Sequence, residues 1–202
     1  MKLYYSPGAC SLSSHITLHE SGMRFEAVAA PTKTHKLLDG TDYYSINPLG
    51  YVPLLELDDG TRITEGPAIV QYIADQIPLK NLAPANGTLA RAQLQSWLNF
   101  ISTELHKGFS PLFNAATPAD YKVIVIDRLM SRLKWTDEQL AGKDYLMGET
   151  FSVADPYLFT VTNWAAVLKL DISAFANITA FRARMSARPA VQAAMKAEGL
   201  VK

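Results

Sequence analysis

The chain has 202 residues, of which 49% are hydrophobic and 19% are charged. This is the composition of a folded globular protein and excludes a disordered chain. The 19 basic residues balance 19 acidic ones, so no basic excess is available to neutralise a nucleic-acid backbone. The single cysteine excludes an intramolecular disulfide and any metal or iron–sulfur site that needs several cysteines.

No apolar run reaches the about 18 residues that a membrane span needs. Ser6-Pro7-Gly8 interrupts any leader-like apolar region near the start of the chain. We therefore expect a cytoplasmic protein that has neither a membrane nor a nucleic acid as a partner.

Residues 1–80 change their hydrophobic period often, as short alternating strands and helices do. The predicted elements are a strand at 2–5, a helix through Leu12, Ile16 and His19 that ends at Gly22, a strand at 25–30, a loop at 32–42, a hairpin at 54–57 and 62–64, and a helix at 67–76. This β-α-β and β-β-α order predicts a small mixed sheet with helices on its faces.

Residues 78–87 contain two prolines and a glycine, a composition typical of a linker. We predict a domain at 1–80, a linker at 81–88 and an all-helical domain at 89–202. The predicted helices of the second domain lie at 89–113, 119–140, 153–168, 178–187 and 190–197. The run Val-Ile-Val-Ile at 123–126 stands apart, because β-branched residues favour strands.

Ser152-Val153-Ala154-Asp155 has the spacing of a helix cap. Ser152 can cap the helix while Asp155 reaches back to the amide of residue 152, and Phe151 can pack on Pro156. We interpret this motif as structural rather than catalytic.

Cys10 follows a strand and a Ser-Pro-Gly turn and opens the first helix. Amides at a helix start stabilise an anion, which is expected to lower the pKa of a thiol there. Cys10-Ser11-Leu12-Ser13 has the outline of a C-x-x-C motif without the second cysteine, so Cys10 could form only a mixed disulfide. The alternative is a buried, unreactive cysteine.

Two further segments could hold an extended ligand. Val52-Pro53 opens a strand after a glycine turn and is a candidate cis peptide bond, which would present the Val52 backbone to a peptide-like molecule. The alternative is an ordinary turn with a trans peptide bond. Glu65 and Gly66 precede a helix, where free amides bind carboxylates and Glu65 can take an ammonium group. The alternative is that Glu65 merely favours the helix start.

Asn99, Thr103 and His106 have the spacing i, i+4 and i+7 and are expected on one helical face, turned either to a site or to solvent. His15 and His19 also share a face, but no third ligand accompanies them. We interpret both as surface histidines of the helix and predict no metal site.

Together these segments resemble the cytosolic glutathione transferases, and most closely the bacterial β class. The resemblance covers nearly the whole chain and is carried by residues 4–12, 47–53, 63–66, 97–100, 104–108 and 151–158. It implies an α+β thioredoxin-like N-terminal domain with a mixed four-stranded sheet, an all-α C-terminal domain and a homodimer.

The resemblance also assigns site residues. Cys10 and His106 are implied to be catalytic. The implied glutathione-binding residues are Cys10, His35, Val52, Pro53, Glu65, Gly66, Asn99, Thr103, Glu104 and His106. The implied hydrophobic-substrate residues, expected in a pocket between the domains, are Tyr5, Phe109, Phe113 and Trp164.

Three positions depart from the family pattern. His35 stands where the bacterial class usually has a lysine that reaches the glycine carboxylate, and Lys33 and Lys36 are alternatives for that contact. Tyr51 replaces a common glutamine, and Pro67 replaces an aliphatic residue. Each is expected to alter the affinity for glutathione.

The implied function is a transferase that conjugates the glutathione thiolate to hydrophobic electrophiles in detoxification, with glutathione as co-substrate and no other cofactor. We expect the start of the first helix, Cys10, Ser11 and His106 to stabilise the thiolate. Two alternatives stay open: glutathione-dependent thiol–disulfide exchange through a Cys10 mixed disulfide, and a non-catalytic carrier of apolar ligands.

Overall fold

The computed structural model describes residues 1–202, and its contacts divide the chain into two compact units. The first unit contains residues 1–83 and 187–202, and the second contains residues 84–186. The division near residue 83 lies in the predicted linker. The last 16 residues, which the sequence placed with the helical domain, pack instead with the first unit.

The first unit is built on a four-stranded mixed sheet with the order β2-β1-β3-β4. Its strands are β1 (Lys2–Tyr5), β2 (Glu26–Ala29), β3 (Leu54–Glu56) and β4 (Arg62–Thr64). Its helices are α1 (Ser11–Ser21), the short η1 (Tyr43–Ser45), α2 (Gly66–Gln76), the short η2 (Pro78–Lys80) and α8 (Pro189–Ala197). β1 is parallel to β2 and antiparallel to β3, which is antiparallel to β4, so the predicted mixed sheet and hairpin are confirmed.

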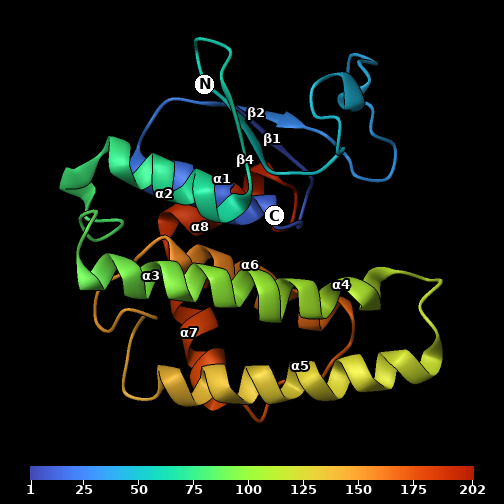
Figure 1. Cartoon of the computed structure of the whole chain (residues 1–202), viewed down its shortest axis with the longest axis vertical. Coiled ribbons are helices and arrows are strands. Elements are labelled where there is room, and N and C mark those ends of the chain that lie inside the picture. Colours follow the sequence, from blue (N-terminus) through green and yellow to red (C-terminus); the bar gives the residue numbers. More distant parts are fainter. The chain divides into compact units, whose positions relative to one another are not determined.

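The sheet has an apolar layer on each face because successive side chains of a strand point to opposite sides. Leu3 and Leu55 pack with α1 and α2, which lie side by side in Figure 1. Tyr4 and Leu54 point the other way and pack with Tyr43 of η1. The sheet therefore fixes the starts of α1 and α2 and the end of the loop before β3.

The chain returns to α1 through α8, and this contact overturns one prediction. The Glu198 carboxylate lies 2.9 Å from His15 Nδ1 and also accepts a 2.8 Å hydrogen bond from the Gly8 amide. His15 is only 1% exposed, and its ring stacks on the ring of His19. The prediction that these are surface histidines is wrong, because the last residues of the chain cover this face of α1.

The second unit is entirely helical. It contains α3 (Leu89–Phe100), η3 (Ile101–His106), α4 (Lys107–Phe113), α5 (Ala119–Leu140), α6 (Ala154–Val167) and α7 (Ala176–Ser186). α3, η3 and α4 form one continuous run that lies along α5 (Figure 1), and η3 is a π-helix that the sequence did not predict. The run at 123–126 is helical despite its β-branching, with Val123 and Ile124 exposed on α5. No helix in either unit is both long and apolar enough to cross a membrane.

The start of α6 shows the predicted cap in a modified form. The buried Asp155 carboxylate accepts hydrogen bonds from the Ser152 amide at 2.7 Å and from the Leu146 amide at 2.9 Å. The Ser152 hydroxyl donates to the same carboxylate at 3.1 Å instead of capping a helix amide. Asp155 is therefore the centre of this cap, and it also holds the loop that precedes the helix.

Candidate functional site

Cys10 lies at the junction of β1 and α1, in the N-cap position of the helix. Its side chain is half-buried, and its Sγ donates a hydrogen bond to the Val52 carbonyl at 3.2 Å. The sulfur is thus in contact with the residue that precedes Pro53. Cys10 is not fully buried, as the alternative assumed, and its reactivity stays a prediction.

Two serines hold the turn that carries Cys10. The Ser11 hydroxyl accepts from the Ser6 amide at 3.1 Å and donates to the Ser6 carbonyl at 3.3 Å. The Ser13 hydroxyl donates to the Cys10 carbonyl at 2.7 Å. Ser11 is fully buried, so its hydroxyl stabilises the turn. This corrects the expectation that Ser11 stabilises a thiolate directly.

The peptide bond between Val52 and Pro53 is cis, which is the first of the two alternatives left open by the sequence. The loop before it is held by the Tyr51 carbonyl, which accepts from Asn47 Nδ2 at 2.7 Å and from the Tyr43 hydroxyl at 2.9 Å. Burial raises the pKa of Tyr43 to about 12, so its hydroxyl stays protonated and remains a donor. The Val52 backbone is consequently fixed beside Cys10.

The turn into α2 lies next to the same two segments. A Cβ added to Gly66 would be 3.8 Å from Pro53 Cγ and 3.9 Å from Ser13 Oγ, so the start of α2, Pro53 and the first turn of α1 converge. Glu65 has a φ of 66°, in the left-handed region that is costly for a residue with a side chain. Its exposed side chain makes no capping hydrogen bond to α2, which leaves the carboxylate available to a ligand.

His35 lies in the loop between β2 and η1, where the centroid of its ring is 4.5 Å from that of the tilted Tyr44 ring. Its Nδ1 is buried without a hydrogen-bond partner. A Cβ on Gly50 would be only 2.9 Å from that nitrogen, so glycine is required at position 50. Lys33 and Lys36, the alternatives for a carboxylate contact, are both exposed.

In the helical unit, His106 closes the π-helix η3 and lies against α6. Its Nδ1 is 2.7 Å from the Tyr157 hydroxyl, and its ring packs edge-on at 4.9 Å against Trp164. Burial, with a smaller effect of the neighbouring Lys107 cation, lowers the pKa of His106 from 6.5 to about 4. The ring is therefore neutral at pH 7 and acts as a hydrogen-bonding group, with one donor and one acceptor nitrogen, rather than as a cation.

Asn99 and Thr103 precede His106 and are exposed. The Thr103 hydroxyl donates to the Asn99 carbonyl at 3.0 Å, so these two residues are neighbours as predicted. The spacing that aligned His106 with them assumed an uninterrupted α-helix. Because Thr103 and His106 both lie in the π-helix η3, His106 does not continue that α-helical register.

Glu104, in the middle of η3, faces α5. Its carboxylate accepts from Arg132 Nε at 2.7 Å and from Arg128 Nη2 at 3.1 Å, and these hydrogen bonds lower the pKa of the carboxyl group. The structure thus gives Glu104 two partners inside the helical unit. Its predicted contact with glutathione stays a prediction.

The residues predicted to contact a hydrophobic substrate divide between the units. Phe109 and Phe113 pack edge-on against Trp164 at 5.8 and 5.6 Å, and Phe113 is 49% exposed. With His106 they form one aromatic cluster of the helical unit. Tyr5 belongs to the core of the first unit, where its ring lies 5.3 Å from that of His15.

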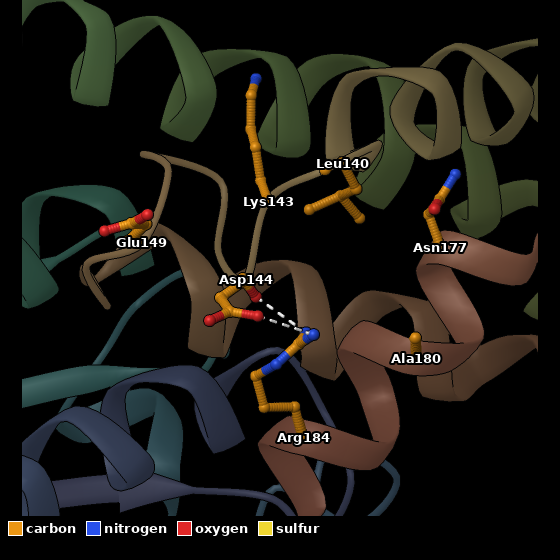
Figure 2. A pocket seen from close by; sticks show the side chains of 8 residues that line it. Leu140, Lys143, Asp144, Glu149, Asn177, Ala180 and Arg184 are labelled. Carbon is orange, nitrogen blue, oxygen red and sulfur yellow. Dashed lines mark hydrogen bonds and ion pairs between the residues drawn. The ribbon is translucent and has the colours of Figure 1, made fainter.

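A separate pocket of about 310 Å³ opens in the helical unit between α7 and the loop that follows α5 (Figure 2). Figure 2 shows Arg184 turned toward Asp144, and Arg184 Nη2 lies 2.9 Å from the Asp144 carboxylate. No predicted site residue lines this pocket. We therefore do not place the functional site there.

The structure thus brings Cys10, Val52, Pro53 and Gly66 together in the first unit and joins His106 to the aromatic cluster in the second. Two residues of these clusters were not assigned from the sequence, Ser13 and Tyr157. Ser13 occupies the fourth position of the C-x-x-S outline and was interpreted only as a missing cysteine. Tyr157 follows the capping motif, one turn into α6, where an aromatic residue gives no sign of its hydrogen-bond partner.

Comparisons with known proteins agree with this geometry. Residues 8–76 match the family model of the glutathione S-transferase N-terminal domain, and residues 100–189 match that of the C-terminal domain. Glutathione S-transferase GstA of Escherichia coli O157:H7 is 48% identical over 200 residues, which cover 99% of this chain and all of that protein. The bacterial transferase BphK, solved as a ternary complex, is 55% identical with a TM-score of 0.97 and matches 98% of this chain and all of its own. The bacterial β-class transferase of Sphingomonas chungbukensis is 46% identical with a TM-score of 0.96 over the full length of both chains.

Proposed function

We propose, from the premise that this chain belongs to the glutathione S-transferase family, that it conjugates the thiolate of glutathione to hydrophobic electrophiles. The observation that carries the proposal is the convergence of three segments in the first unit. Cys10 touches the carbonyl of Val52, and Gly66 lies beside Pro53 and Ser13. Each segment offers one kind of group that a tripeptide thiol requires.

We assign the parts of glutathione to these segments by their chemistry. The backbone of Val52 pairs with the main chain of the cysteinyl residue, as an added strand would. The start of α2 at Gly66 offers amides to the γ-glutamyl carboxylate, and the Glu65 carboxylate takes its ammonium group. We assign the carboxylate at the glycine end to the loop that carries His35, with the exposed Lys33 and Lys36 as the alternatives for that contact.

The chemical task is to keep the glutathione sulfur deprotonated. A thiol with a pKa of about 8.5 is only a few per cent ionised at pH 7. Lowering that pKa by about 2 units requires about 2.7 kcal/mol of preferential stabilisation of the thiolate. Since His106 is neutral, it contributes a hydrogen bond rather than a charge, and most of the stabilisation is assigned to the start of α1 and the Cys10 side chain.

The second substrate is assigned to the aromatic cluster of the helical unit. Phe113 is half-exposed on Trp164, so an aryl halide can stack there and replace water on an apolar surface. The thiolate attacks the electrophilic carbon and the halide leaves with the electron pair. Holding both reactants in position supplies the acceleration.

Titration of the purified protein with glutathione tests the first step, with binding measured by calorimetry and ionisation measured by the ultraviolet absorbance of the thiolate. Conjugation with a panel of aryl halides and epoxides tests the second. We expect heat of binding, a gain of thiolate absorbance at pH 7 and turnover. No heat at millimolar glutathione together with no conjugation would remove the proposal.

Thiol–disulfide exchange is a second candidate, favoured by the position of the half-buried Cys10 at the start of α1. Glutathione would have to act as the resolving thiol, since the chain has one cysteine. Replacement Cys10→Ala separates the two reactions, because exchange requires this sulfur whereas conjugation uses that of glutathione. Ser13→Ala, which leaves the sulfur in place, is the control.

The finer assignments follow from the family. We propose a cytoplasmic homodimer that acts in detoxification, with glutathione as co-substrate and no other cofactor. Sedimentation equilibrium over a range of concentrations measures the stoichiometry, and a constant monomer mass would overturn the dimer. Cell fractionation and survival of a deletion strain on aryl halides test the other two assignments.

A further inference from the structure

The π-helix η3 interrupts a helix that otherwise runs from Leu89 to Phe113. The Lys107 amide donates to the carbonyl of Ser102, five residues back, instead of four. Pro111 follows within α4 and has no amide to offer to the carbonyl of Lys107. A proline and an added residue per turn are recognised causes of a local change in helix register.

This change of register determines where His106 points. One additional residue in a turn rotates the following side chains by about 100° relative to an uninterrupted α-helix. In the structure, His106 reaches the Tyr157 hydroxyl at 2.7 Å and the ring of Trp164 at 4.9 Å, both on α6. Regular α-helical hydrogen bonding through residues 101–106 would turn the imidazole away from these partners.

A π-helix is intrinsically rare, so neighbouring contacts must favour it over the α-helical alternative. Two of its residues, Ile101 and Leu105, are fully buried and anchor it by packing. The polar anchor is Glu104, which holds the Arg132 Nε at 2.7 Å and the Arg128 Nη2 at 3.1 Å. The two arginines are four residues apart on α5, so their guanidinium groups clamp one carboxylate from neighbouring turns.

We propose that Glu104 is a positioning residue: by pairing with Arg128 and Arg132 it holds η3 in the π register and so keeps His106 against Tyr157 and Trp164. Glu104 thus acts on His106 from the opposite side of the helix. The importance of His106 for the reaction rests on the proposed function, whereas its position can be measured without any assay of activity.

The test follows the titration of the His106 ring by NMR, with the resonance identified as the one that is missing from His106→Asn. In the wild-type protein this ring is partly buried against α6 and its pKa is about 4. In Glu104→Ala we expect the ring to leave α6 and to titrate at least about one pH unit higher, toward the value of an exposed histidine. Glu104→Gln keeps the shape of the side chain without its charge and should give a smaller shift in the same direction.

Asp144→Ala is the control for the loss of an ion pair elsewhere in the same unit, because it breaks the pair of the exposed Asp144 with Arg184. It should leave the titration of His106 unchanged. An unchanged titration in Glu104→Ala, or an equal shift in Asp144→Ala, would overturn the proposal.

Reversal of the pair distinguishes a positioning residue from a glutathione ligand. In Glu104→Arg combined with Arg132→Glu, the ion pair re-forms with opposite polarity, and Arg128 still has an acidic neighbour. We expect the double variant to recover both the wild-type titration of His106 and the KM for glutathione. Recovery of the titration with a KM that stays raised would show a direct contact with glutathione and overturn the indirect role.

The two proposals fail separately. If the wild-type protein does not conjugate glutathione but Glu104→Ala still shifts the titration of His106, then the proposed function fails and the positioning role stands. If conjugation is normal and the titration does not move, the positioning role fails and the proposed function stands.

Discussion

Replacement of Asp155 by alanine should strongly destabilise the helical unit. The carboxylate is fully buried and accepts from two backbone amides, those of Ser152 and Leu146, and from the Ser152 hydroxyl. Each buried amide left without a partner costs about 1–3 kcal/mol. Because the two amides share one acceptor, their costs need not add in full, and we expect a total loss of about 3–4 kcal/mol.

This loss can be measured by urea unfolding followed by tryptophan fluorescence. All 3 tryptophans, Trp97, Trp135 and Trp164, lie in the helical unit, so their emission reports on that unit. With a slope of about 2–3 kcal/mol per M urea, the midpoint should fall by about 1 M or more.

Asp120→Ala is the control for the helix dipole alone, since Asp120 is an exposed acidic residue in the first turn of α5. It should cost less than about 0.5 kcal/mol. If the midpoints of the two variants agree within error, the Asp155 hydrogen bonds do not stabilise this unit as we have argued.

Three further predictions concern other parts of the molecule. The pKa of His106 falls from 6.5 to about 4 on folding, so the unfolded chain binds the proton more tightly than the folded chain does. The free energy of unfolding should therefore be highest above pH 6.5 and should decline by about 3 kcal/mol toward pH 4. The variant His106→Asn should flatten this part of the plot of urea midpoint against pH. Gly50→Ala places a Cβ 2.7 Å from the Tyr44 ring at a φ of 66° and should lower the stability of the first unit by more than about 1 kcal/mol. Gly40→Ala is the control, because its φ is 87° but its Cβ would meet open space, so it measures the backbone cost alone. Equal losses of stability in thermal unfolding would exclude the clash at Gly50. Glu198→Ala removes the buried carboxylate that partners His15 and accepts from the Gly8 amide, and should cost about 2–4 kcal/mol in the same measurement. Retention of wild-type stability would mean that water can replace this carboxylate.

Local patterns in the sequence were sufficient for most of the fold. The hydrophobic periods predicted all four strands and the main helices, because the period of 2 and the period of 3.6 are set by backbone geometry. Glycine and proline marked the ends: Gly22 adopts the left-handed conformation that terminates α1, and Pro189 opens α8. The family motifs then placed Cys10, the cis Pro53 and Gly66 on segments that the sheet brings together.

Other features depended on contacts between residues that are distant in the chain. His15 looked like a surface residue until Glu198, 183 residues later, covered it. Ser11 looked like a group that faces a ligand, but its hydroxyl bonds the backbone of Ser6.

The register of His106 is the clearest case of this division. The sequence by itself determined that a histidine follows Asn99 and Thr103 on one long helix, because helix formation depends on neighbouring residues. Only the tertiary structure decided that the helix takes an additional residue per turn at Ile101–His106, with Glu104 paired to α5 and His106 bonded to α6. The α and π registers of one segment have similar local energies compared with the packing on each side, so the choice between them belongs to the neighbouring helices.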